Sequence, residues 1–273
     1  MDALATLESR RFGGITRLFG PEGAARLRAA HVVVVGIGGV GSWAAEALAR
    51  SGIGTLTLID LDHVAESNLN RQVHALESTI GMAKVDAMRA RILEIAPGCD
   101  LRTVDDFVTT ENVASLIPAD ADFVIDAIDQ MKPKAALIAH CRAAGIPVVA
   151  CGAAGGRTDP LRLRQEDLAR TAGDALLASV RARLRRAHGF PAPPAKTRDA
   201  ARAERFGVTA IFSDEQPARP DACDLRGGAA LNCAGYGSAV TVTAPMGMAA
   251  AGFVMRMIAA GRARPKAPPA RAA

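Results

Sequence analysis

The segment from His31 to Ser51 constrains the fold of this chain more than any other. It begins with the continuous apolar run HVVVVG (31–36), passes through a glycine-rich stretch, and continues as SWAAEALARS (42–51), which is rich in helix-forming residues. A second apolar run, TLTLID (55–60), follows. Continuous apolar runs of this length are typical of strands that are buried on both faces of a parallel sheet. The segment therefore predicts a strand, a helix and a second, parallel strand.

The same alternation of apolar runs and helix-forming segments continues as far as residue 151. We expect helices at residues 82–96, 111–116 and 133–144, and strands at residues 101–105, 122–128 and 147–151. Strands that alternate with helices predict a parallel sheet with helices on both faces, and such sheets bind ligands at the carboxyl ends of their strands.

The pattern changes after Cys151. A helix with a strongly basic face is expected at 175–187, a strand at 207–212 and a final helix at 247–260. Between that strand and that helix lies a polar, turn-rich stretch, 213–228, which we predict to be a mobile loop. The expected fold class is α/β: a Rossmann-like, doubly wound, mostly parallel sheet that is extended by a C-terminal mixed or antiparallel portion.

Composition narrows the class of protein. The longest apolar stretch, 239–260, is interrupted by a proline, two glycines and an arginine, whereas a membrane span needs about twenty uninterrupted apolar residues, so we expect a buried helix there. The N-terminus has no basic flank followed by an apolar core, so no secretory signal is expected and the chain is predicted to be cytoplasmic. The five cysteines form no CxxC pair, which argues against a disulfide framework and against a zinc site.

Basic residues gather in one segment. From Arg157 to Arg205 the chain has twelve arginines and lysines against six acids, whereas the whole chain has a formal charge of +5. A basic helix face is often only a solvated surface, but it can also bind nucleic acid. Trp43 and Tyr236 are the only Trp and Tyr, so stacking on bases has little support, and contact of arginines with phosphates is the mode to expect.

The glycine-rich stretch carries the first chemical signal. Gly36, Gly38 and Gly41 fit the pattern G-x-G-x-x-G, directly after a strand and at the start of a helix. Glycines in this place let backbone amides approach a phosphate at the positive end of the helix dipole. Asp60 ends the next strand, where an acid can accept hydrogen bonds from ribose hydroxyls. A nucleotide site is therefore predicted, but enzymes of hydride transfer and of phosphate chemistry share all of these features.

The residues after Asp60 separate these two chemistries. If Arg71 and Lys84 flank the mouth of the glycine loop, they can neutralise a triphosphate, and Asp129 can hold a magnesium ion between phosphate oxygens. Hydride transfer needs no such clamp, whereas attack at an α-phosphate builds charge on the transferred group and on the departing pyrophosphate. Each residue alone also has an ordinary structural explanation, as part of a polar loop, a helix start or a strand end.

The order of the motifs GIGGVGS, LIDLDHV, SNLNRQ, GMAK and DAID resembles the E1-like activating enzymes of the ThiF, MoeB and HesA type. This resemblance covers residues 11–152. It implies that ATP binds in the glycine loop with Mg²⁺ at Asp129, and that Arg71, Lys84, Asp129 and an N-terminal arginine are catalytic. The implied nucleotide contacts are Gly36, Gly38, Gly39, Gly41, Asp60, Asp62, Asn68, Arg71, Gln72, Lys84, Asp126 and Asp129.

Further strings are similar to one subfamily, the tRNA threonylcarbamoyladenosine dehydratases. They include VGIGGVGSWAAEALAR, NRQVHAL, KAALIAHCR, GAAGGRTDP and NCAGYGSAVTVTA, and they extend the resemblance over almost the whole chain. The implied reaction is ATP-dependent adenylation of the carboxylate of N6-threonylcarbamoyladenosine at position 37 of tRNA, followed by ring closure with loss of water. Because the carbamoyl group is held beside the activated carbonyl, closure needs no protein nucleophile. The implied partners are this tRNA, a second copy of the chain in a homodimer, and a cysteine desulfurase or sulfur acceptor.

Three departures from the family bear on these expectations. Family members that activate sulfur-carrier proteins usually have two CxxC pairs, which this chain lacks, so activation of another carboxylate, such as a sulfur-carrier C-terminus, is kept as the alternative. The family's N-terminal arginine is replaced by a glycine here, so Arg17 is the candidate to complete a partner's ATP site and Arg11 is the alternative. Cys233 matches a cysteine typical of the subfamily and Ala210 replaces another; sulfur relay and simple packing both stay open for Cys233.

We divide the chain into four parts on this basis. They are an N-terminal helical segment (1–30), a Rossmann-like ATP-binding half (31–152), a C-terminal half that faces the substrate and tRNA (153–262), and a disordered tail (263–273). Two other classes of protein remain. A nicotinamide-dependent oxidoreductase would change nicotinamide absorbance, and a nucleotide-binding scaffold would bind ATP without turnover.

Overall fold

A seven-stranded sheet forms the centre of the computed structural model, which describes residues 3–192, 204–218 and 236–264. The strand order is β3-β2-β1-β4-β5-β7-β6, and every pairing is parallel except that of β6 with β7. This confirms the doubly wound, mostly parallel sheet with an antiparallel extension. The strands are β1 His31–Val35, β2 Thr55–Ile59, β3 Asp100–Val104, β4 Phe123–Asp126, β5 Val148–Cys151, β6 Leu163–Asp167 and β7 Thr209–Ser213.

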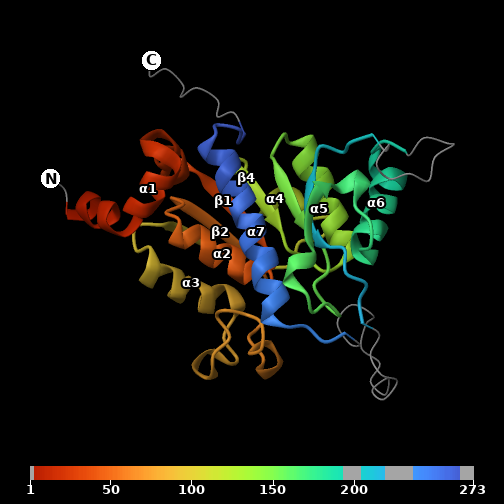
Figure 1. The fold of residues 1–273 in the computed structure, drawn as a ribbon, viewed down its shortest axis with the longest axis horizontal. Coiled ribbons are helices and arrows are strands. Elements are labelled where there is room, and N and C mark those ends of the chain that lie inside the picture. The colour runs from red at the N-terminus through yellow and green to blue at the C-terminus, as the bar shows by residue number, and fades with distance from the viewer. Residues whose placement is uncertain (1–2, 193–203, 219–235, 265–273) are drawn as a thin grey trace.

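Helices cover both faces of the sheet (Figure 1). α1, α2, α3 and α7 share one apolar core with the sheet, whereas α4, α5 and α6 share the other. The helices are α1 Ala3–Ala29, α2 Gly41–Arg50, α3 Lys84–Ile95, α4 Val113–Leu116, α5 Met131–Ala143, α6 Ala175–His188 and α7 Val240–Ala259, with short 3-10 turns η1 Glu66–Asn68, η2 Glu77–Thr79, η3 Pro160–Arg162 and η4 Leu168–Arg170.

β1 shows why the central strands are apolar at every position. Val32 and Val34 belong to the core beneath α2 and α7, while Val33 and Val35 belong to the core beneath α5 and α6, and all four are at most 2% exposed. Successive side chains of a strand point to opposite faces. Because helices cover both faces, neither set can be polar.

The order in which successive strands are added to the sheet reverses at β1. β2 and β3 lie on one side of β1, whereas β4 and β5 lie on the other. The loops that follow β1 and β4 therefore leave the sheet toward opposite faces, which opens a crevice at the carboxyl ends of these strands. This edge of the sheet carries the glycine loop.

β6 is a strand that the sequence analysis did not predict. Its residues, LRQED, are all partly or fully exposed, and it pairs antiparallel with β7 from Leu163 opposite Ser213 to Asp167 opposite Thr209. An edge strand that is not covered on either face needs no apolar pattern. Its formation depends on backbone hydrogen bonds to a strand about forty residues away, which no local pattern reveals.

α7 begins at Val240, seven residues before the predicted start at Gly247, because the helix continues through Pro245. Among the described residues it is the one helix long and apolar enough to cross a membrane, and half of its most apolar window is buried. It packs against α1 and α2 over the sheet. A Cβ atom on Gly247 would lie 2.2 Å from the carbonyl oxygen of Val40, so this glycine allows α7 to lie directly against the start of α2. The packing supports a core helix.

The predicted loop and tail are only partly described. Residues 219–228 of the loop, residues 265–273 of the tail, Cys223 and Cys233 lie outside the described residues. Cys99, Cys141 and Cys151 are free. Burial raises the pKa of Cys99 to about 11 and that of Cys141 and Cys151 to about 12, so these thiols are poor nucleophiles at neutral pH.

Candidate functional site

The loop between β1 and α2 needs two of its glycines for its own shape. Gly36 has a φ of +86°, and a Cβ atom on it would lie 2.9 Å from the carbonyl oxygen of Ala127. A Cβ atom on Gly41 would lie 1.8 Å from the carbonyl oxygen of Gly36. Both positions exclude any larger residue because the opposing atoms belong to the backbone. These two glycines pack the loop against the turn that follows β4.

The other two glycines have different surroundings: Gly38 faces open space, whereas Gly39 lies against two side chains. The nearest atom to a Cβ atom on Gly38 would be the side-chain nitrogen of Gln72, at 4.0 Å. A Cβ atom on Gly39 would lie 3.2 Å from Cγ of Arg71 and 3.2 Å from Cγ2 of Thr243. Gly39 therefore lets the stem of Arg71 lie on the loop, and Gly38 keeps the backbone open to a ligand.

Asp60 ties the glycine loop to the end of β2. Its Oδ2 accepts a hydrogen bond from the Ile37 amide at 2.6 Å, and its Oδ1 accepts one from the Asp62 amide at 2.8 Å. Burial raises the pKa of the Asp60 carboxyl, and Lys84 and the two amides oppose that rise. Each oxygen keeps a second lone pair, so the predicted contact with ribose is compatible with this arrangement.

The segment between β2 and α3 returns on itself and brings Lys84 to the site. His63 bridges to Ala83, and Val64 exchanges backbone hydrogen bonds with Gly81 and Met82. This closure places Lys84 at the first position of α3, where its Nζ lies 2.7 Å from Oδ2 of Asp62. The lysine side chain is 7% exposed and that of Asp62 is 54% exposed. Two predicted nucleotide contacts are thus paired with each other.

Arg71 lies against the glycine loop, where its Cγ would be 3.2 Å from a Cβ atom on Gly39. Its Nη1 donates to the carbonyl of Ser67 at 2.7 Å and to Oδ1 of Asn70 at 2.9 Å. Its own carbonyl accepts a hydrogen bond from the indole of Trp43 at 2.9 Å. The guanidinium is therefore held by neutral oxygens, which leaves its charge without a carboxylate partner among these contacts.

Asn68 and Gln72 are both buried in the same segment. Oδ1 of Asn68 accepts from the Ala65 amide at 3.1 Å, and the Asn68 carbonyl accepts from the Gln72 amide at 3.0 Å. Asn68 therefore shapes the turn that carries Arg71. Oε1 of Gln72 is buried and has no hydrogen-bond partner in the described part of the chain. Buried polar atoms are seldom left unpaired, so this amide is available to a ligand.

Thr243 is a site residue that the sequence analysis missed. It lies in the first turn of α7, is 3% exposed, and its hydroxyl has no hydrogen-bond partner within the described ranges. Its methyl group contacts the glycine loop at Gly39. More than 200 residues separate the two positions in the sequence, so no local signal could have indicated the contact. Gln72 itself was predicted, but no sequence signal could have shown that its side-chain oxygen is buried and unpaired in the described part of the chain.

The acid that ends β4, Asp126, and the acid that follows it, Asp129, have different environments. Asp126 is fully buried, and its Oδ1 lies 2.9 Å from Nζ of Lys134, which is also fully buried. Burial raises the pKa of the Asp126 carboxyl, and Lys134 opposes that rise. Asp129 is exposed in the turn beyond. The predicted role of Asp126 as a direct nucleotide contact does not fit this enclosure, whereas Asp129 is accessible.

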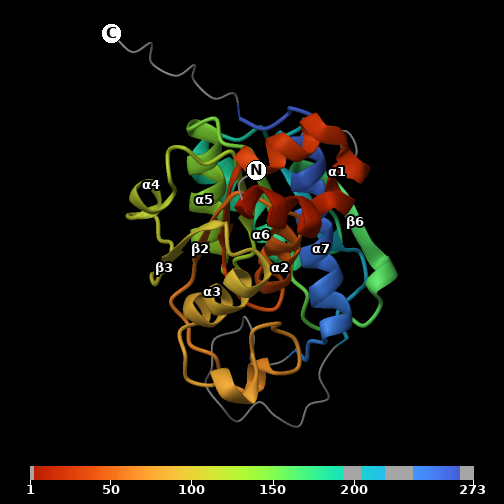
Figure 2. The ribbon, with the colours of Figure 1, turned by 90° about the vertical axis from the view of Figure 1, so that its left-hand side faces the viewer.

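The N-terminal arginines lie at the opposite edge of the sheet. α1 leads into the amino ends of β1 and β2, where the amide of Thr55 donates to the carbonyl of Ala30. Figures 1 and 2 both show α1 far from the segment between β2 and α3, which is drawn in orange below the sheet. Arg17 is exposed on α1. Arg17 therefore lies on a helix that is far from the nucleotide side of its own chain.

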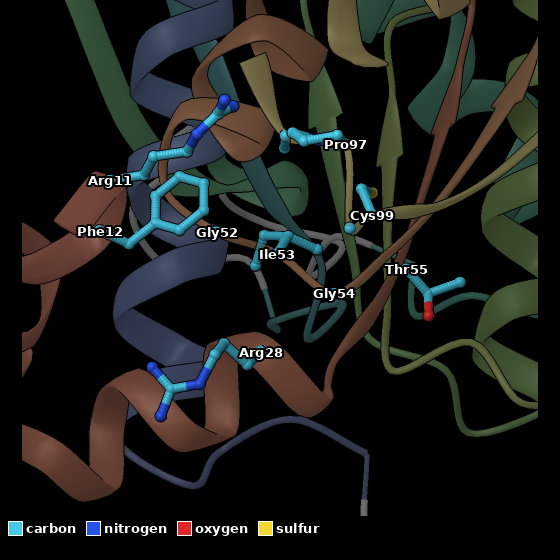
Figure 3. A pocket seen from close by; sticks show the side chains of 11 residues that line it. Arg11, Phe12, Arg28, Gly52, Ile53, Gly54, Thr55, Pro97 and Cys99 are labelled. Carbon is cyan, nitrogen blue, oxygen red and sulfur yellow. The ribbon is translucent and has the colours of Figure 1, made fainter. Parts of the chain in front are cut away.

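Arg11 is hydrogen-bonded beside a cavity at the amino ends of the strands. Its Nη1 donates to the carbonyl of Ile95 at 2.7 Å, at the end of α3. Beside it, Phe12 and Arg28 line a cavity of about 200 Å³ together with residues 52–55 and 96–99 (Figure 3). A Cβ atom on Gly52 would lie 3.1 Å from the ring of Phe12. None of the predicted nucleotide contacts lines this cavity.

The basic segment is less available for nucleic acid than its charge suggests. Five of its arginines are held by other groups: Arg157 pairs with Asp174, Arg162 and Arg164 pair with Asp214, Arg181 donates to Thr171, and Arg185 lies over the ring of Phe206. Arg183, Arg186 and Arg205 have no carboxylate partner among the described residues. Lys196, Arg198 and Arg202 lie outside those residues.

Comparison with known proteins agrees with this geometry. Residues 13–268 match the model of the ThiF family. The chain belongs to the ThiF family. This ThiF-family chain is 44% identical, over 264 residues, to the tRNA threonylcarbamoyladenosine dehydratase of Escherichia coli, a match that covers 93% of this chain and 96% of the relative. It is 44% identical over 250 residues to the enzyme of that name from Haemophilus influenzae, covering 90% and 92%.

A solved structure is similar to this ThiF-family chain over most of its length. The crystal structure of the Escherichia coli tRNA N6-threonylcarbamoyladenosine dehydratase in complex with ATP superposes with a TM-score of 0.81 at 43% identity. The superposition covers 93% of this chain and 95% of that protein. The similarity thus includes the basic second half as well as the nucleotide half.

Proposed function

We propose that this ThiF-family chain is a tRNA threonylcarbamoyladenosine dehydratase. It adenylates the carboxylate of N6-threonylcarbamoyladenosine at position 37 of tRNA with ATP and then dehydrates it to the cyclic form. The observation that carries the proposal is the extent of the similarity, because an enzyme of this activity matches both halves of the chain at 43% identity and binds ATP. Arg71, Lys84 and Asp129 are the proposed catalytic residues.

The first step is attack by a carboxylate oxygen of the substrate on the α-phosphorus of ATP. The bond between the α- and β-phosphates breaks and pyrophosphate leaves. Charge then builds on the phosphate oxygens, and positive groups that are already in place stabilise it most. Arg71 lies over Gly39 and Lys84 lies at the start of α3, so the two cations flank the loop that would hold these phosphates.

The second step is ring closure. The neighbouring carbamoyl group attacks the activated acyl carbon, AMP leaves with the former carboxylate oxygen, and a proton is released. The net change in the nucleoside is the loss of one water. Both reacting groups belong to one nucleoside, so their effective concentration is very high. This agrees with the raised pKa values of the described thiols, because no cysteine nucleophile is needed.

The residues present fit Mg²⁺ as a companion of ATP. No group of three or more His, Cys, Asp or Glu that could hold a metal alone occurs in the described ranges. Mg²⁺ in ATP-dependent enzymes usually takes one or two carboxylates and completes its shell with phosphate oxygens and water. The exposed carboxylate of Asp129 suits such a site. When bound, Mg²⁺ would neutralise charge on the phosphates.

A homodimer would bring Arg17 to an ATP site, because the arginine of one chain could then reach the glycine loop of the other. In its own chain Arg17 lies at the amino edge of the sheet, away from the glycine loop, so a second copy would have to bring it to the ATP site. Mixing two inactive proteins tests this. In an equal mixture of Arg17→Ala and Lys84→Ala, half of the dimers are mixed and one of their two sites is intact, so about a quarter of wild-type turnover should return. No recovery after subunit exchange would exclude Arg17 acting between subunits.

The tRNA contacts, the sulfur partner and the location stay proposals. Arg183, Arg186 and Arg205 are the described arginines proposed to contact tRNA phosphates, because no carboxylate holds them. A cysteine desulfurase or sulfur acceptor is the proposed sulfur partner, and Cys233 lies outside the described residues. Since the substrates are ATP and tRNA, the reaction is placed in the cytoplasm.

Mass spectrometry of tRNA nucleosides after incubation with the protein and ATP tests the proposed function. We expect a loss of one water from N6-threonylcarbamoyladenosine, together with release of AMP and pyrophosphate. The alternative is activation of another carboxylate, such as a sulfur-carrier C-terminus. Pyrophosphate release that a small sulfur-carrier protein stimulates, with no change in the tRNA nucleoside, would support that alternative and exclude the dehydratase.

A further inference from the structure

The ammonium group of Lys134 is enclosed in the first turn of α5. Its Nζ lies 2.9 Å from Oδ1 of Asp126, 3.1 Å from the Asp126 carbonyl oxygen and 2.9 Å from the Ile128 carbonyl oxygen. The side chain is 0% exposed. An ammonium group has three donors, and here three acceptors from one short turn surround it. Such a group fixes the conformation of that turn.

Hydrogen bonds hold both the amide groups and the carbonyl groups of the turn at residues 126–128. The Ala127 amide donates to the carbonyl of Val35 in β1 at 2.9 Å, and the Ile128 amide donates to Oδ1 of Asp126 at 3.1 Å. Lys134 then holds the carbonyl groups. All of these hydrogen bonds join groups of the protein itself, so the chain supplies the contacts that hold the turn.

This turn is one wall of the glycine loop. A Cβ atom on Gly36 would lie 2.9 Å from the Ala127 carbonyl oxygen, and one on Gly41 would lie 3.2 Å from Cβ of Ala127. Asp129, the proposed Mg²⁺ ligand, follows the turn directly. A movement of the turn would therefore displace the phosphate-binding loop and this carboxylate together.

We infer that Lys134 is a positioning residue: by holding the turn at residues 126–128, it keeps Asp129 and the glycine loop at the spacing that ATP and its metal ion require. The inference rests on the proposed function and deepens it. It also gives Asp126 a role as the partner of Lys134 instead of a direct contact with the nucleotide. Small errors of placement at a reacting phosphate are costly, because a shift of about 1 Å can slow a reaction about 100-fold.

The test must separate positioning from simple loss of folding. Lys134→Met alone leaves Asp126 buried without its partner, which destabilises proteins strongly. The double variant Asp126→Leu/Lys134→Met removes both charges and keeps apolar volume, a change that proteins often tolerate. Lys134→Arg is a second variant. It keeps the positive charge, but its donors are spread over a planar guanidinium group and are not on a single nitrogen atom, so it cannot reproduce the three hydrogen bonds. Lys132→Met alters an exposed lysine of the same helical turn and is the matched control.

Four quantities are measured for each folded variant: amide hydrogen exchange at residues 127–129, ATP affinity with and without Mg²⁺, kcat, and KM for tRNA. We expect faster exchange, a loss of the Mg²⁺-dependent part of ATP affinity and an about 100-fold lower kcat, with KM for tRNA unchanged. Lys132→Met should match the wild type. Wild-type exchange and wild-type kcat in a folded Lys134 variant would overturn the inference. Exchange and ATP affinity need no tRNA turnover, so they test Lys134 even if the wild type fails to form the cyclic product.

Discussion

Nζ of Lys84 lies 2.7 Å from Oδ2 of Asp62, although the lysine is almost fully buried and the aspartate is half exposed. The pair joins the first residue of α3 to the segment that follows β2. A buried ammonium beside an accessible carboxylate is poised to exchange one anionic partner for another, since a phosphate can take the place of the carboxylate. Asp62 thus fixes the position of the Lys84 ammonium group beside the glycine loop.

Lys84→Ala should lower kcat for cyclisation by about 100- to 1,000-fold, because it removes a fixed positive charge from the developing pyrophosphate. ATP should still bind, since the glycine loop is unchanged. Rapid-quench measurement of AMP formation gives the rate. Arg89→Ala, an exposed arginine of the same helix, is the control and should keep wild-type kcat. A Lys84→Ala protein with wild-type kcat would remove this residue from the mechanism.

Two glycines of one loop should respond differently to alanine. Gly41→Ala places a Cβ atom 1.8 Å from the carbonyl oxygen of Gly36, so the backbone must shift and the free energy of unfolding should fall by about 1 to 3 kcal/mol. Gly38→Ala meets no atom closer than 4.0 Å and should fold normally, but its methyl group occupies the space proposed for a phosphate. Thermal unfolding and ATP titration separate the two effects. Equal stability of both variants would contradict the packing described for Gly41.

Asp129→Asn should lower the Mg²⁺ dependence of the reaction. The amide keeps the size of the side chain but loses the charge that attracts the cation, so more Mg²⁺ should be needed for half-maximal AMP formation, and kcat should fall about 100-fold. Glu22→Gln, which changes an 86% exposed acid on α1, is the matched control. An Asp129→Asn protein with the Mg²⁺ response of the wild type would show that the metal ion binds elsewhere.

His74 should make the folded protein sensitive to acid. The ring is 1% exposed, and neither ring nitrogen has a hydrogen-bond partner in the described part of the chain. Burial, with Lys84 and Arg91 nearby, lowers the pKa of His74 to about 4. Between about pH 6.5 and pH 4 the unfolded chain therefore binds more protons than the folded one, so stability falls as pH falls, by about 3 kcal/mol over the whole range.

His74→Leu is the variant that measures this contribution. Urea unfolding at several pH values gives the free energy of unfolding for both proteins. The difference between them should shift in favour of the leucine variant as the pH is lowered from about 6.5 to about 4, and should level off outside this range. His188→Leu, at the exposed end of α6, should follow the wild type. A constant difference between His74→Leu and the wild type would mean that His74 keeps its ordinary pKa.

Much of the fold and of the site followed from local patterns. Apolar runs such as HVVVV predict parallel strands because both faces of such strands are buried, and this held for β1, β2, β4 and β5. The glycine spacing predicted the loop after β1. Arg71 and Lys84 were proposed as nucleotide contacts because they lie in the motifs SNLNRQ and GMAK, which resemble those of the family.

Contacts between distant segments could not be predicted in this way. The β6 strand depends on pairing with β7, and its own sequence is that of a polar loop. Asp126 and Asp129 look alike in the motif DAID, yet the packing of α5 encloses one with Lys134 and leaves the other exposed. The resemblance suggested that Arg17 completes a partner's ATP site, but only the tertiary structure shows that it lies on α1, away from the glycine loop of its own chain.

The sequence by itself thus determined the α/β class, the nucleotide loop and the set of charged residues around it, because these depend on residues close together in the chain. Only the tertiary structure decided which polar groups are buried and which face a ligand. The physical reason is that burial and pairing depend on contacts between distant segments. The Lys134 ammonium group is buried and makes three hydrogen bonds only when α5 packs on the end of β4. Thr243 contacts Gly39 only when α7 lies on α2.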